Sequence, residues 1–240
     1  MSDIEDDTCG NAMYEAVRKI WMKFLLYLFK SPYKRHSIGL VTWSTKSYEK
    51  WLILQNLLYL TRPAQLVELG AGRSTYYLAE YALKFSAKVV SIEQHLYYCL
   101  KINTALKLSF LPAGIVKYAP IRGDWYDVSR VKKYLLPFNN IDFLYVDGPT
   151  ILSHGRRESR SFYNSIPPLL GEVKVIIVDD VDREESNEMA SYLQKGFSLK
   201  RYDVKGSEGE AILAILLDCD AAEKVSELPS YLRNLLIPVE

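Results

Sequence analysis

The stretch QLVELGAGRSTYYLA, residues 65–79, decides the fold of this 240-residue chain. Its first residues, up to Leu69, form a short apolar run that predicts a buried strand. Gly70 and Gly72 follow, and glycine allows a sharp turn there and leaves room for a ligand, because it has no Cβ. Residues 74–85 continue with apolar side chains at helical spacing, so we expect a helix whose free N–H groups face the turn.

Polar side chains surround the predicted turn. Glu68 precedes Gly70 by two residues in an acid-x-Gly-x-Gly pattern, and we expect Ser74 and Thr75 to cap the helix. A second acid, Glu93, ends the next apolar run, KVVSIE, where a carboxylate can accept hydrogen bonds from both hydroxyls of a ribose. The pairing of glycine turn and acid predicts a cofactor that contains a nucleoside.

Composition describes a globular chain. The hydrophobic fraction of 49% and the charged fraction of 25% are ordinary for globular proteins, and the length favours one α/β domain. The net charge of +1 gives no reason to expect a nucleic-acid partner. Cys9, Cys99 and Cys219 lie far apart, which indicates reduced thiols. Because the N-terminus is acidic and the apolar segment 20–29 is too short for a membrane span, we expect a cytoplasmic protein without a transmembrane segment.

Two helices are predicted before the glycine turn, at 13–30 and 48–60. We assign 1–62 to an N-terminal tail and helical cap, and 63–240 to the ligand-binding domain. The first helix is either a docking helix or an element that lies on a membrane surface. A homodimer face is expected on this helix if it does not pack on its own domain; the side chains concerned are Trp21, Phe24, Leu25 and Leu28.

From residue 65 onward, strand patterns alternate with helix patterns. Strands are expected at 65–69, 88–93, 114–120, 141–147 and 174–180, with helices at 74–85, 95–108, 126–136, 158–170 and 184–195. Near-continuous apolar strands separated by helices predict a parallel sheet with helices on both faces. The last two strands, 198–206 and 210–219, are joined by a turn too short for a parallel crossover. We therefore predict an α/β, Rossmann-like, mostly parallel seven-stranded sheet with an antiparallel last hairpin.

This arrangement resembles the class I S-adenosylmethionine-dependent methyltransferases over residues 50–220. The resemblance is carried by VELGAG at 67–72, Glu93, VDGP at 146–149, VDD at 178–180 and the terminal hairpin. A dinucleotide-binding domain would continue with a parallel sixth strand and would normally have a third glycine in place of Thr75. The resemblance implies S-adenosylmethionine as cofactor and O-methylation of a small molecule or saccharide. An NAD(P)-dependent oxidoreductase and a non-catalytic methyltransferase-like binding subunit stay open as alternatives.

The resemblance also implies a set of cofactor-binding residues. The glycine turn would hold the methionine end, Glu93 the ribose, and Gln94 and Asp124 the adenine. The full set is Glu68, Gly70, Ala71, Gly72, Ser74, Thr75, Glu93, Gln94, Gly123, Asp124 and Asp147.

Three aspartates, Asp147, Asp179 and Asp180, follow two of the predicted strands. Carboxylates that converge at one sheet edge repel one another unless a cation lies among them, and oxygen ligands suit Mg²⁺. The layout resembles metal-dependent O-methyltransferases, but this chain has DGP rather than DGD and lacks a glycine pair before its fifth strand. The alternative is that Asp179 caps the next element while Asp182 and Arg183 form a surface pair.

The loop after VDGP supplies candidates for catalysis. His154 is a candidate general base because the pKa of histidine is near neutrality, and Asp147 would act beside it. Lys46 is a secondary candidate. Three arginines would bind an anionic or sugar-acid acceptor, or else form the solvated face of the following helix; they are Arg156, Arg157 and Arg160.

Overall fold

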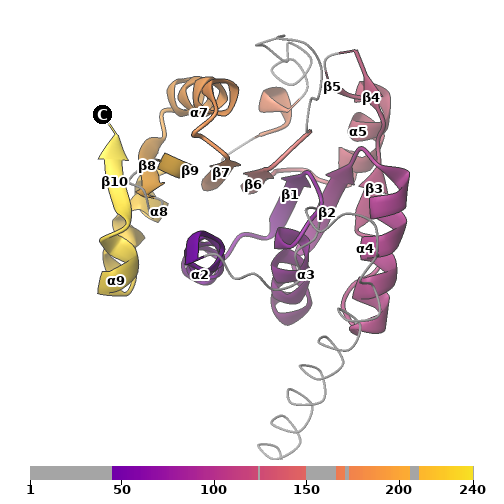
Figure 1. Ribbon diagram of the computed structural model, residues 1–240, viewed down its shortest axis with the longest axis horizontal. Coiled ribbons are helices and arrows are strands. Elements are labelled where there is room, and N and C mark those ends of the chain that lie inside the picture. Colours follow the sequence, from indigo (N-terminus) through magenta and orange to yellow (C-terminus); the bar gives the residue numbers. More distant parts are fainter. Residues whose placement is uncertain (1–44, 124, 150–165, 171–172, 206–210, 240) are drawn as a thin grey trace, which may run out of the picture.

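The computed structural model describes residues 45–123, 125–149, 166–170, 173–205 and 211–239. Its strands are Gln65–Leu69 (β1), Lys88–Glu93 (β2), Val116–Tyr118 (β3), Ile121–Arg122 (β4), Trp125–Tyr126 (β5), Phe143–Val146 (β6), Val175–Asp179 (β7), Lys200–Lys205 (β8), Ala211–Leu217 (β9) and Leu236–Val239 (β10). In the described chain eight of these strands form one sheet in the order β10-β8-β9-β7-β6-β1-β2-β3, and β4 pairs with β5 separately (Figure 1).

The sheet is parallel from β3 to β7, and β9 then enters antiparallel to both β7 and β8. This confirms the predicted parallel sheet with an antiparallel last hairpin. The predicted number of strands is wrong, because β10 adds an eighth strand antiparallel to β8. β10 is short and contains Pro238. A proline is tolerated at a sheet edge, but it lacks the N–H that a strand donates, so its presence argues against a strand in the sequence.

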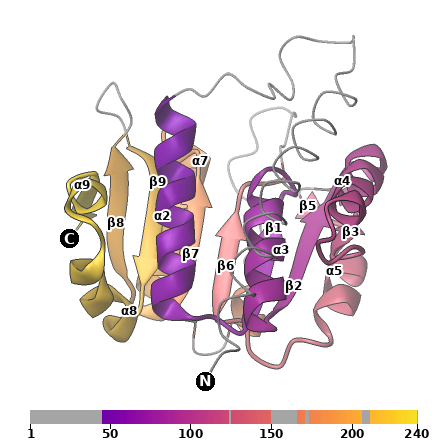
Figure 2. The same ribbon diagram turned by 90° about the horizontal axis from the view of Figure 1, so that it is seen from below.

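Helices cover both faces of the sheet, as predicted (Figures 1 and 2). The helices are Thr45–Thr61 (α2), Ser74–Phe85 (α3), Leu96–Leu108 (α4), Val128–Leu135 (α5), Glu184–Phe197 (α7), Cys219–Glu223 (α8) and Ser230–Arg233 (α9), with short 3-10 turns at Pro167–Leu169 (η1) and Lys224–Glu227 (η2). Helices α2, α3 and α4 lie on one face, and α5 and α7 lie on the other.

Helix α2 belongs to the core rather than standing apart from it. Its buried residues Ile53, Leu54 and Leu57 share one apolar cluster with Phe143 of β6 and Ile177 of β7. Residues at this spacing fall on one side of a helix, which explains why α2 packs along the sheet. The first described turns of α2 therefore lie near the carboxyl ends of the central strands.

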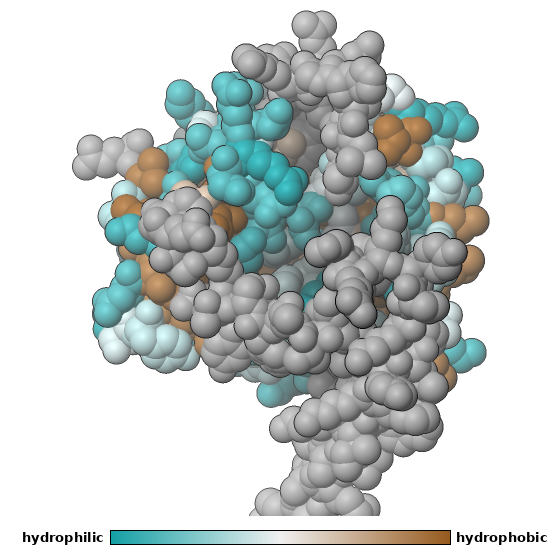
Figure 3. Space-filling model, viewed as in Figure 1, coloured by the Kyte–Doolittle hydropathy of each residue, from teal (hydrophilic) through white to brown (hydrophobic). Residues whose placement is uncertain are grey.

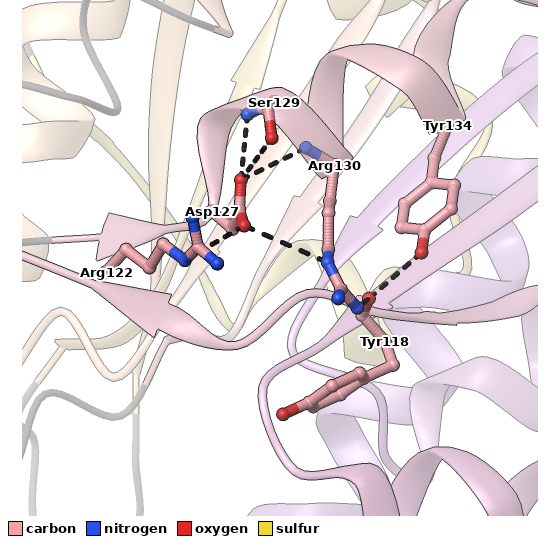
Figure 4. Close-up of polar contacts among 6 residues, drawn as sticks. All are labelled: Tyr118, Arg122, Asp127, Ser129, Arg130 and Tyr134. Atoms are coloured by element: carbon pink, nitrogen blue, oxygen red, sulfur yellow. Dashed lines mark hydrogen bonds and ion pairs between the residues drawn. The ribbon is translucent and has the colours of Figure 1, made fainter.

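Helix α5 is held at its start by Asp127 (Figure 4). One carboxylate oxygen accepts hydrogen bonds from the backbone N–H groups of Ser129, at 3.1 Å, and Arg130, at 3.3 Å. The other oxygen lies 3.1 Å from Nε of Arg122. This cap fixes the short β4–β5 hairpin against α5.

Several elements differ from their predicted bounds by one to three residues, and two differ more in character. The third strand, predicted at 114–120, spans only Val116–Tyr118, and at its start the side chain of Asn103 accepts hydrogen bonds from the N–H groups of Gly114 (2.9 Å) and Val116 (3.2 Å). Of the helix expected at 158–170, only the end is described, and it is the 3-10 turn η1. The helix predicted at 13–30, with its dimer face, lies outside the described residues.

The surface and the cysteines agree with the composition. In Figure 3 the side chains over α7 are mainly hydrophilic, and apolar residues appear as separate patches.

Cys99 and Cys219 carry free thiols. Among the described residues, no helix has the length and apolar character needed to cross a membrane.

Candidate active site

The candidate site lies where the strand order reverses, at the carboxyl ends of β1 and β6. Open α/β sheets bind ligands in the crevice at such a point. Here the glycine turn after β1 touches the segment after β6. Gly70 has φ +91°, and a Cβ on it would lie 2.7 Å from the carbonyl carbon of Asp147 and 3.0 Å from the nitrogen of Gly148. The two segments are thus packed backbone to backbone, which only glycine permits.

Glu68 supports the turn from inside the protein. It is fully buried, and the hydroxyls of Ser74, Thr75 and Ser91 all donate hydrogen bonds to its carboxylate. The N–H of Gly72 donates to Oγ1 of Thr75 at 2.9 Å, which connects the turn to the same network. The prediction that Ser74 and Thr75 cap α3 is therefore wrong. Both hydroxyls donate to Glu68, and α3 starts without a side-chain cap.

Burial changes the protonation of Glu68. It raises the pKa from 4.5 to about 7, against the opposing effect of the three hydroxyl donors. A carboxyl group with a higher pKa in the folded state contributes stability that is present below its unfolded pKa of 4.5 and is lost as the pH rises through 7.

We therefore expect the free energy of unfolding of the wild type, relative to Glu68→Gln, to fall by about 3 kcal/mol over this pH range. Urea denaturation of both proteins across the range measures it. A difference that does not change with pH would contradict the raised pKa.

Glu93, at the end of β2, lies beside the same turn. Its carboxylate accepts hydrogen bonds from the backbone N–H groups of His95 at 2.7 Å and Ala71 at 3.2 Å. Burial raises its pKa. The adjacent Gln94 contacts the ring of His95, with 2.9 Å between their Nε2 atoms. Glu93 thus joins the glycine turn to the start of α4.

The structure also brings the three aspartates together. The side chain of Asp147 is exposed on one side. Desolvation by the surrounding protein raises its pKa, and the negative charges of Asp179 and Asp180 raise it further. The pKa of Asp180 is raised by the same two kinds of cause, burial first and Asp179 second. Their arrangement at the ends of β6 and β7 agrees with the sequence pattern.

The positive charge in this cluster comes from Lys50 of α2. Its ammonium binds Asp179 and lies 3.8 Å from Asp180. Asp179 also accepts hydrogen bonds at 2.8 Å from the hydroxyl of Tyr145 and from the N–H of Asp180. Arg183 pairs with Asp180 at 3.0 Å, whereas the alternative to a metal site paired Arg183 with Asp182.

This arrangement does not fit the predicted Mg²⁺ ligands, Asp147, Asp179 and Asp180. Lys50 already contacts two of the three carboxylates, so a divalent ion ligated by the same oxygens would lie against an ammonium group. In the described part of the chain, no group of three or more His, Cys, Asp or Glu residues is arranged to hold a metal ion.

Two of these residues were not foreseen from the sequence, although each carries a signal. Lys50 precedes Ile53, Leu54 and Leu57 at helical spacing, so it extends the buried side of α2. Ser91 is a polar residue within an apolar strand, and it faces Glu68 directly in the parallel register. A polar residue on a buried side needs a polar partner.

The remaining predicted residues are placed only in part. Gly123 forms the β4–β5 turn at φ +75° and is exposed. Lys46 lies in α2, but its side chain is not described. The others lie outside the described residues: Asp124, His154, Arg156, Arg157 and Arg160.

No protein-family model and no curated protein matches the sequence. Solved structures do resemble it. An O-methyltransferase from Bacillus cereus, in complex with SAH, has a TM-score of 0.52 and 15% identity, covering 86% of this chain and 91% of its own. A proposed O-methyltransferase from Klebsiella pneumoniae has a TM-score of 0.52 and 11% identity, covering 86% of this chain and 96% of its own.

A third structure, a proposed caffeoyl-CoA O-methyltransferase from Staphylococcus aureus, has a TM-score of 0.51 and 14% identity, covering 70% of this chain and 83% of its own. At such low identity the likeness concerns the fold. The chain thus has the fold of the class I S-adenosylmethionine-dependent methyltransferases.

Proposed function

We propose that the chain is an S-adenosylmethionine-dependent methyltransferase that acts on an oxygen of a small molecule or saccharide. The observation that carries the proposal is the turn from Gly70 to Gly72, which lies between Glu93 and Asp147 at the switch point of this fold. The turn carries no side chain larger than the methyl of Ala71, and an acid lies on each side of it.

The residues present fit this cofactor. Glu93 lies at the end of β2 beside the turn, where its carboxylate would accept the ribose hydroxyls. Glu68, buried below the turn, would act through the shape of the turn rather than by direct contact. Asp147 would face the methionine end and the acceptor, because it follows the strand next to β1.

The chain would contribute mainly alignment. S-adenosylmethionine supplies an electrophilic methyl group on a positively charged sulfur. The glycine turn and Glu93 would hold that cofactor, while the aspartates after β6 and β7 would orient the acceptor oxygen on the other side of the crevice. Fixing two reactants in line can lower a barrier by about 7–11 kcal/mol. No step is assigned to Mg²⁺, since Lys50 already binds Asp179 and lies 3.8 Å from Asp180.

Calorimetric titration tests the proposal. We expect one molecule of S-adenosylhomocysteine to bind per chain and NAD(H) not to bind. Binding of NAD(H) alone would favour an oxidoreductase and contradict the proposal. Binding of neither ligand, with no methyl transfer from labelled S-adenosylmethionine to a panel of hydroxylated acceptors, would favour a non-catalytic binding subunit.

A further inference from the structure

We propose that the ammonium of Lys50 takes the place of a metal ion among the aspartates at the ends of β6 and β7. The site therefore excludes divalent metal ions. Lys50 is a positioning residue in this view: it holds Asp179 and Asp180 in place from helix α2. The exclusion of divalent ions by Lys50 follows from the described contacts alone. Its consequence for catalysis, methyl transfer without a metal, rests on the proposed function.

The carboxylate of Asp179 accepts from three donors. One oxygen accepts from Lys50 and from the N–H of Asp180, and the other accepts from the hydroxyl of Tyr145. The side chain is only 7% exposed, and that of Lys50 is 16% exposed. A charge-assisted pair at this depth, in a carboxylate that accepts from two further donors, is a built arrangement rather than a surface contact.

The direction of the strands explains why Lys50 meets these acids. Side chains alternate along a strand, so Asp179 lies on the same side of the sheet as Val175 and Ile177. Those two residues pack in the same apolar cluster as Ile53 of α2. Lys50 stands one helical turn before Ile53 and therefore reaches the end of β7 on that side.

The charges near Lys50 come from several elements. Asp179 ends β7 and Asp180 follows it, Asp147 follows β6, and Arg183 precedes α7. Lys50 lowers the pKa of Asp147 and of Asp180, in the direction expected for a nearby cation, against the larger raising effects. Without Lys50, the three carboxylates would keep only Arg183 as a described partner cation.

The proposal has a direct physical consequence. An ammonium between two carboxylates repels a second cation, so the wild type should bind Mn²⁺ or Mg²⁺ poorly. Removing the ammonium while keeping the length of the side chain would leave oxygen ligands without a counter-charge, which is the environment that a hard divalent ion prefers.

Electron paramagnetic resonance of free Mn²⁺, with and without protein, measures this without a known acceptor. We expect no binding to the wild type at millimolar Mn²⁺, and for Lys50→Met a Kd at least about tenfold below the highest Mn²⁺ concentration at which the wild type shows no binding. Lys50→Arg should again exclude the ion, because it restores the charge. Lys133→Met, at an exposed lysine of α5, is the matched control and should behave like the wild type.

The proposal can also be overturned without the Lys50 variants, so a poorly folded Lys50→Met does not prevent a decision. Stoichiometric Mn²⁺ binding to the wild type that is lost in Asp179→Asn would contradict it. So would a methyl-transfer rate that falls at least about tenfold in EDTA and returns with Mg²⁺. If the protein does not bind S-adenosylhomocysteine, the proposed function fails, while the Mn²⁺ result still decides the role of Lys50.

Discussion

Gly70→Ala should lower the free energy of unfolding by about 2–6 kcal/mol and abolish binding of S-adenosylhomocysteine. The backbone at Gly70 has φ +91°, which strains any residue with a Cβ. The added methyl would also overlap the backbone of Asp147 and Gly148, which cannot move away as a flexible side chain would. The turn would have to separate from the segment after β6, and the crevice between them would change shape.

Urea denaturation and calorimetric titration measure the two effects. Gly72→Ala is the matched control for stability, because no atom lies within 4 Å of a Cβ built there. We expect this control to stay within about 1 kcal/mol of the wild type. If the two alanine variants are equally stable, the contact between Gly70 and Asp147 does not have the importance assigned to it.

Glu93→Ala has the second large expected effect, a loss of affinity for S-adenosylhomocysteine of at least about 100-fold. The expectation rests on the proposed function. The variant would lose the carboxylate that accepts the two ribose hydroxyls, and hydrogen bonds to a charged group contribute about 1.5–3 kcal/mol each. It would also free the N–H groups of Ala71 and His95, which Glu93 now binds.

The affinity is measured by calorimetric titration after a thermal-unfolding check that the variant is folded. Glu93→Gln should lose less than the alanine variant, because its amide oxygen still accepts a hydrogen bond. Glu188→Gln, at an exposed position of α7, is the control. An affinity of Glu93→Ala within about twofold of the wild type would remove Glu93 from the cofactor site.

Local sequence patterns predicted most of the described fold. The helix at 74–85 has the bounds of α3, and the strands at 65–69 and 88–93 have those of β1 and β2. These elements are long, apolar on the buried side and bounded by glycine or polar residues, so neighbouring residues specify them. Short elements were less predictable: β3 and β10 have three and four residues and depend on Asn103 and on the β8 edge.

Some residues of the candidate site could likewise be predicted from local sequence, and others could not. The glycine turn follows an apolar strand pattern and Glu93 ends one, which predicts where they lie. The partners of Glu68 depend partly on register: Ser91 lies on another strand, 23 positions away. Lys50 and Asp179 are 129 positions apart, and no local pattern connects them. Three nearby aspartates suggested a missing cation, but only the packing of α2 against the sheet identifies it.

The sequence by itself determined the alternation of strands and helices, the antiparallel end of the sheet and the glycine turn with its neighbouring acid. These depend on backbone preferences and on burial periodicity, both of which act over a few residues. The tertiary structure alone decided that Glu68 is buried among hydroxyls and that a lysine of α2 pairs with Asp179 and Asp180. Protonation and ion pairing depend on which distant side chains share a buried space, and that space exists only once the chain has folded.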